Sequence, residues 1–148
     1  MNPELRALYQ EMILDHGRRP RHFGAPAEFT HKLEAFNPLC GDRLTLYATV
    51  ADGEIKNIQF DGKGCAISVA SASMMCDEVE GKPCAHADDL FHRFHKLVTG
   101  QESSGNIGRL EILAGVKDFP ARVKCATLAW HTLDHMLKGD SAEAISTE

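Results

Sequence analysis

The sequence predicts a single α+β domain in which a small antiparallel three-stranded sheet is covered by helices. Two observations predict this class: extended segments follow one another between residues 28 and 60, and segments with helical periodicity lie before and after them. The chain has 148 residues, of which 43% are hydrophobic and 25% charged, which suits one folded domain and excludes a disordered or low-complexity chain. We place the domain at 1–148 and expect residues 140–148 to form a frayed tail.

The first element is an amphipathic helix that ends near Gly17. Its apolar residues recur at helical spacing and are Leu5, Leu8, Tyr9, Met12 and Ile13. Residues 16–22 are basic and contain a proline, which predicts a loop. This loop is either a solvated surface segment or a docking edge.

Three strands are predicted next, at 28–36, 43–50 and 54–60. In the second of these, apolar residues alternate with polar ones, which is typical of a half-buried strand. Residues 51–53 include Asp52 and Gly53 and predict a tight turn between the second and third strands. These segments therefore form a small antiparallel sheet.

The rest of the chain predicts helices. Small and apolar residues at helical spacing indicate a helix between Gly64 and Gly81, a second helix ends at Gly100, and a last helix begins at Pro120 and ends near Lys138. The side chains expected to face the core from the last helix are Leu128, Ala129, Thr132, Leu133 and Met136.

Charge and hydropathy exclude two classes of partner. Sixteen basic against 21 acidic residues give a net charge of −5 with no basic block, which argues against nucleic-acid binding. The longest uncharged run, at 64–76, is too short for the ~20 residues of a membrane-spanning helix. Charged residues interrupt the N-terminal segment, so no secretory signal is indicated and we expect a cytoplasmic protein.

The five cysteines carry the strongest functional signal. In a reducing compartment they serve metal binding, catalysis or simple burial rather than disulfides. Cys65 and Cys125 lie near the starts of predicted helices, where the helix dipole favours the thiolate, and Cys40 lies in a glycine-flanked loop. Asp42 adds a carboxylate two residues after Cys40, so these four residues would make a four-coordinate zinc site. No CxxC pair is present, and burial remains an equal alternative on spacing alone.

The residues around these cysteines resemble the U-type iron–sulfur cluster assembly family, which comprises the NifU N-terminal and IscU-like proteins. The matching segments are NPLCGD at 37–42, GKGC at 62–65 with the residues to 75, and FPARVKCATLAW at 119–130. The resemblance extends from Leu8 through the last helix, nearly the whole chain, and implies the α+β fold of that family.

Three features resemble the SufU branch of this family more than the IscU branch. The segment between Cys65 and Cys125 is longer than in IscU proteins, Lys124 stands where they have a histidine ligand, and residues 119–122 replace their chaperone-recognition motif. The resemblance to SufU implies a zinc protein that accepts sulfur from a cysteine desulfurase of the SufS type and passes it to downstream cluster-assembly proteins.

The same resemblance assigns individual roles. Cys40, Asp42, Cys65 and Cys125 match the zinc ligands, and Cys40 matches the sulfur acceptor. Our hypothesis adds Arg122, which precedes Cys125 by three residues on one helical face and would pair with Asp42 or with the freed Cys40 thiolate. Two alternatives stay open: a scaffold on which a [2Fe–2S] cluster is assembled on the same cysteines, and a zinc-stabilised interaction module without transfer chemistry.

The remaining candidate ligands are interpreted as structural or surface residues. Cys76 and Cys84 match no family ligand and are expected to be small apolar or incidental residues. His131 and His135 are spaced four residues apart but lie off the apolar stripe of the last helix, so we expect them in solvent. His92 and His95 are likewise predicted at the surface, and Met74 and Met75 in the core; these residues are not expected to bind metal.

Overall fold

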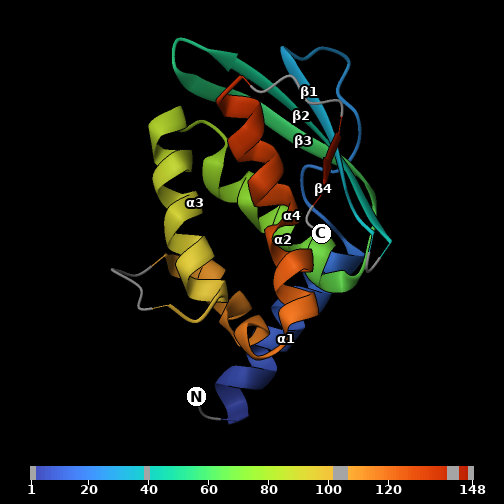
Figure 1. Cartoon of the computed structure of the whole chain (residues 1–148), viewed down its shortest axis with the longest axis vertical. Coiled ribbons are helices and arrows are strands. Elements are labelled where there is room, and N and C mark those ends of the chain that lie inside the picture. Colours follow the sequence, from blue (N-terminus) through green and yellow to red (C-terminus); the bar gives the residue numbers. More distant parts are fainter. Residues whose placement is uncertain (1–2, 39–40, 102–106, 140–143, 147–148) are drawn as a thin grey trace.

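The computed structural model describes residues 3–38, 41–101, 107–139 and 144–146, and it confirms the predicted α+β class. A four-stranded sheet in the order β3-β2-β1-β4 lies against a layer of helices (Figure 1). The helices are α1 (Pro3–Arg18), α2 (Ala66–Val79), α3 (Cys84–Val98) and α4 (Pro120–Leu137), with a 3₁₀ helix, η1 (Gly108–Asp118). The strands are β1 (His31–Asn37), β2 (Asp42–Ala51), β3 (Glu54–Lys63) and β4 (Ala144–Ser146).

The predicted antiparallel meander is confirmed, with different ends. Asp52 and Gly53 both adopt positive φ and form the tight turn between β2 and β3, which suits a two-residue hairpin. β3 extends beyond residue 60 to Lys63, where it pairs with Arg43. This extension brings the chain that follows β3 to the beginning of β2.

The expectation of a frayed tail at 140–148 is wrong for residues 144–146, and the rest of this segment lies outside the described residues. Residues 144–146 form β4, which pairs in parallel with residues 34–36 of β1. The physical reason is that the free edge of β1 presents backbone N–H and C=O groups, with which a short extended segment can pair.

The helices bury one face of the sheet. α4 packs against β1 and β2, α2 packs against β3, and α3 lies on the far side of α4 (Figure 1). Trp130 of α4 stacks on Phe94 of α3 with ring centroids 4.6 Å apart. The predicted inward residues of α4 are all buried, as are Met74 and Met75.

The predicted surface loop at 16–22 contains one buried side chain. His16, near the end of α1, is buried, and its Nδ1 lies 2.8 Å from Ser73 Oγ on α2. Burial lowers the pKa of His16, and the charge of Arg21 lowers it further. A polar residue near a helix end is therefore part of the α1–α2 contact.

Among the described residues no helix is long and apolar enough to cross a bilayer.

Candidate metal centre

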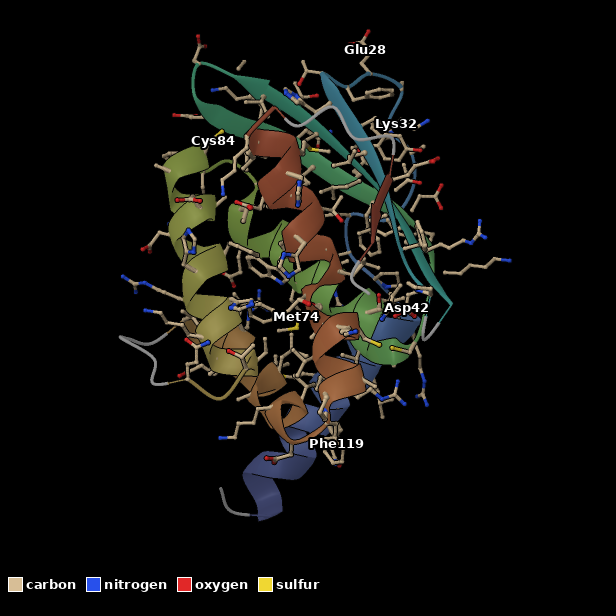
Figure 2. The ribbon with its side chains drawn as sticks, viewed as in Figure 1. Glu28, Lys32, Asp42, Met74, Cys84 and Phe119 are labelled. Carbon is tan, nitrogen blue, oxygen red and sulfur yellow. The ribbon has the colours of Figure 1, made fainter. Side chains whose placement is uncertain are left out.

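Three side chains from distant parts of the sequence converge where β2, α2 and α4 begin. One potential ligand atom each from Asp42, Cys65 and Cys125 lies within 4.8 Å of the other two. Figure 2 shows Asp42 at the end of the sheet beside the helices. These are three of the four residues that the sequence analysis assigned to the zinc site.

Asp42 is the first residue of β2 and is fully buried. Its Oδ1 accepts a hydrogen bond of 2.9 Å from the backbone N–H of Cys65. Its Oδ2 is also buried, and no hydrogen-bond partner for it exists among the described residues. A buried carboxylate oxygen without a donor is costly unless a cation satisfies it, so this atom points to a metal ion.

Cys65 and Cys125 present their sulfur atoms from the early parts of two helices. Cys65 is the N-cap of α2, and its Sγ accepts from the Ser68 backbone N–H at 3.4 Å. Cys125 lies in the second turn of α4 and is fully buried. The Asn37 side-chain amide donates to Cys125 Sγ at 3.9 Å. Partial positive charge at a helix start and amide donors both favour a sulfur atom that carries negative charge.

Two glycines allow the chain to pass close to these residues. A Cβ on Gly62, whose φ is +144°, would collide with the Arg43 carbonyl. A Cβ on Gly64 would lie 2.7 Å from Asp42 Oδ1, the atom that receives the Cys65 hydrogen bond. The Gly-x-Gly-Cys sequence therefore lets the turn after β3 lie directly against β2.

Arg122 is exposed on the first turns of α4, and its guanidinium lies beside both sulfur atoms. The charge that Cys65 can carry, followed by a hydrogen bond to Cys125, raises the pKa of Arg122 above its ordinary value. Of the two partners predicted for Arg122, Asp42 makes no contact with it among the described residues, and Cys40 lies outside them. Arg122 thus adds a cation at the solvent side of a site whose ligands are anionic when ionised.

Cys40 lies outside the described residues. On either side of it, Asn37 pairs with Asp42 across β1 and β2, and the Asn37 carbonyl accepts from the Gly41 N–H at 2.9 Å. Residues 38–41 therefore connect two paired residues at one end of the sheet.

The donor set fits a zinc ion. One carboxylate and two thiolates from the described residues are ligands that Zn²⁺ accepts, and a tetrahedral site needs one more. Thiolates also bind iron–sulfur clusters, so the donor chemistry suits both kinds of centre.

Comparison with known proteins gives the family. Residues 8–126 match the model of the NifU-like N terminal domain. The chain belongs to this family. It is 41% identical over 137 residues to the iron–sulfur cluster assembly scaffold protein IscU of Streptococcus pyogenes serotype M1, covering 91% of this chain and 86% of that protein.

Members named SufU match about as well as those named IscU. The zinc-dependent sulfurtransferase SufU of Bacillus subtilis is 38% identical over 135 residues, covering 90% of this chain and 91% of its own. The crystal structure of FiSufU from Fervidobacterium islandicum AW-1 superposes with a TM-score of 0.83 at 31% identity, covering 92% of this chain and 99% of that one. These similarities establish the family and do not separate its SufU and IscU types.

The other candidate ligands lie away from the cluster in this NifU-like domain. Burial among apolar side chains raises the pKa of the Cys76 thiol well above its ordinary value, and Cys84 is half-buried at the start of α3. In the part of the chain that the structure describes, no second group of three His, Cys, Asp or Glu side chains is placed to hold one metal ion.

The expectation that His131 and His135 are solvent-exposed is wrong, since both are half-buried. The His131 ring lies 5.3 Å from Phe91 and 5.9 Å from His95, measured between centroids. The reason is that α3 covers the face of α4 next to the core stripe, so α4 buries a wider arc than one stripe predicts. His95 is also half-buried, while His92 is exposed as predicted.

Sequence reasoning missed the contact of Asn37 with Cys125. One signal was available, because the alternation along β1 places Leu33, Ala35 and Asn37 on the same buried face. A polar residue at an inward strand position needs a buried partner.

Proposed function

We propose that this protein acts in iron–sulfur cluster assembly as a SufU-type, zinc-dependent sulfur acceptor. Cys40, Asp42, Cys65 and Cys125 would hold the zinc ion, and Cys40 would receive sulfur from a cysteine desulfurase of the SufS type. The convergence of Asp42, with its unpartnered buried Oδ2, on two thiols carries the proposal. The B. subtilis relative named a zinc-dependent sulfurtransferase supports it.

The proposed transfer moves one sulfur atom without an external oxidant or reductant. The Cys40 thiolate attacks the terminal sulfur of the persulfide on the desulfurase. A bond forms between Cys40 Sγ and that sulfur, the persulfide S–S bond breaks, and the desulfurase cysteine leaves as a thiolate. Zinc, when bound, keeps the ligating thiols deprotonated at neutral pH. Downstream cluster-assembly proteins in the cytoplasm would then receive the sulfur from Cys40.

The different placements of the ligands suit different roles. Cys65 caps the start of α2, Cys125 lies within α4 and Asp42 belongs to β2, so their backbones are fixed by hydrogen bonding and packing. The sequence places Cys40 in a glycine-flanked loop between β1 and β2, so Cys40 would be the ligand that leaves the metal and reaches a partner. Arg122, beside two of the sulfur atoms, would stabilise the Cys40 thiolate by charge once it is released.

The proposal is tested by following labelled sulfur. A SufS-type desulfurase is supplied with ³⁵S-cysteine, and label on the chain is measured after non-reducing electrophoresis. We expect Cys40→Ser to abolish labelling and Cys84→Ser, a matched change far from the cluster, to retain it. Labelling of Cys40→Ser at the parent rate would refute Cys40 as the acceptor.

A scaffold is the second candidate, favoured by the relatives named scaffold protein IscU and by the thiol ligands. In this case, iron and sulfide should produce a [2Fe–2S] chromophore that passes intact to an acceptor apoprotein. If the domain were a zinc-stabilised interaction module instead, Cys40→Ser would weaken metal retention and folding without a specific loss of desulfurase stimulation.

A further inference from the structure

Asn37 occupies an unusual position for a neutral polar residue. It is the last residue of β1, it is fully buried, and it follows Leu33 and Ala35 on the inward face of the strand. A buried amide is costly unless its hydrogen-bonding groups are satisfied. The alternation alone would favour an apolar side chain here, so the amide calls for a specific explanation.

The backbone and the side chain of Asn37 contact different parts of the candidate centre. Its backbone pairs with Asp42, and its carbonyl accepts from Gly41, so it closes the connection that contains Cys40. Its side-chain Nδ2 donates to Cys125 Sγ on α4. One residue therefore links the Cys40 connection to the sulfur of Cys125.

A donor at this place suits a sulfur atom bound to metal. Three thiolates and one carboxylate on Zn²⁺ leave an excess of negative charge on the ligands. A hydrogen bond to a ligating sulfur withdraws part of that charge and fixes the direction of the sulfur lone pairs. The amide supplies this donor without adding a charge that would compete with the metal.

We propose that Asn37 is a positioning residue that holds the Cys125 sulfur in the ligating orientation and tunes its bond to the metal. This inference rests on the proposed function in one respect, since it takes Cys125 to be a metal ligand. In this role Asn37 would act through Cys125 and would bind neither the metal nor the transferred sulfur atom itself.

The test uses Co²⁺ as a spectroscopic probe of the full chain. Asn37→Asp replaces the amide donor with a carboxylate of the same shape, and Asn37→Ala removes the donor without adding charge. The matched control is Asn57→Asp on β3, where the amide donates to Gln59 and the residue pairs with Thr49 instead of a candidate ligand. Co²⁺ affinity is measured by chelator competition, and the thiolate-to-cobalt charge-transfer band by absorption.

The variants should change both measurements in a set order. Loss of an outer hydrogen-bond partner weakens metal binding by about 10- to 100-fold, so we expect a dissociation constant raised in this range for Asn37→Ala and at least as much for Asn37→Asp. The band should move to longer wavelength in both, since a sulfur without the hydrogen bond gives up charge more easily. Asn57→Asp should match the parent.

Further readouts separate positioning from folding and from sulfur transfer. A purely structural role would lower the thermal midpoint of the metal-free variants but leave the band of the loaded protein in place, and that result would overturn the inference. If Asn37→Asp fails to fold, Asn37→Ala decides the question by its band position. Sulfur labelling of Cys40→Ser tests the proposed function separately. If the Asn37 variants shift the band while Cys40→Ser is still labelled at the parent rate, the role of Asn37 is supported and Cys40 is refuted as the sulfur acceptor.

Discussion

The early and late parts of helices α2 and α4 carry similar residue types in different surroundings. In the early parts, Cys65 and Cys125 face a buried carboxylate with an unpartnered oxygen. In the late parts, Cys76 is enclosed by apolar side chains and His131 packs against Phe91. The comparison indicates that residue type alone does not make a cysteine or histidine a candidate metal ligand. A nearby carboxylate and a position at a helix start distinguish the candidates from the buried residues.

The sharpest way to break this comparison is to exchange sulfur for oxygen at both ends of α2. Cys65→Ser removes a proposed thiolate ligand, so the zinc dissociation constant should rise by more than about 100-fold, beyond the effect of losing an outer hydrogen-bond partner. Cys76→Ser should leave zinc affinity at the parent value. It buries a hydroxyl in apolar surroundings and should lower the free energy of unfolding by about 1–3 kcal/mol.

Chelator competition measures the zinc affinities, and urea unfolding of the metal-free proteins measures the stabilities. An equal loss of zinc affinity in Cys65→Ser and Cys76→Ser would show that the two ends of α2 do not differ in metal binding.

Asp42→Asn separates metal binding from stability. The amide oxygen still accepts from the Cys65 N–H, but an amide nitrogen that cannot bind zinc replaces Oδ2, so zinc affinity should fall by at least about 100-fold, more than on loss of an outer hydrogen-bond partner. The metal-free variant should be at least as stable as the metal-free parent, because a neutral amide with one unpaired buried atom costs less to bury than a carboxylate with one. Urea unfolding with and without zinc measures both effects. A metal-free variant less stable by more than about 1 kcal/mol would mean that the chain itself satisfies this carboxylate.

The sequence predicts much of this arrangement, for identifiable reasons. Periodicity predicts α2 and α4, and the glycines before Cys65 predict its place at a helix start, because these signals are local. The unpartnered Oδ2 of Asp42 and the contact of Asn37 with Cys125 were not predictable, since they depend on how β1, β2 and α4 pack. The burial of His131 was missed for the same reason, because α3 covers it from outside its own helix.

Gly64→Ala tests how closely the turn before α2 must approach Asp42. The added methyl group would lie 2.7 Å from Oδ1, so either the carboxylate or the turn must shift. We expect zinc affinity to fall about fivefold, equivalent to about 1 kcal/mol. Gly115→Ala is the matched control, because an added Cβ there meets nothing within 4 Å. Chelator competition measures both variants, and an unchanged affinity for Gly64→Ala would show that the cluster tolerates a displaced Asp42.

The smallest effect concerns the late part of α4 and the pH dependence of folding. Burial lowers the pKa of His131, and the charges of His95 and His135 lower it further, while Asp134 opposes them. The unfolded chain has an ordinary histidine pKa near about 6.5, so below that pH it binds more protons at this position than the folded chain. The contribution of His131 to stability is therefore constant above about pH 6.5 and falls as the pH drops toward its folded pKa.

His131→Gln should remove this part of the acid sensitivity. Metal-free protein is used so that protonation of the thiolates does not contribute, and urea unfolding is measured at about pH 7.5 and about pH 5.5. The parent should lose more stability on acidification than His131→Gln, by less than about 1 kcal/mol, since one pKa unit corresponds to about 1.4 kcal/mol and the ring is only half-buried. His92→Gln, at an exposed ring, should behave as the parent. An equal acid sensitivity in all three proteins would place the effect elsewhere, with the buried His16 as the next group to replace.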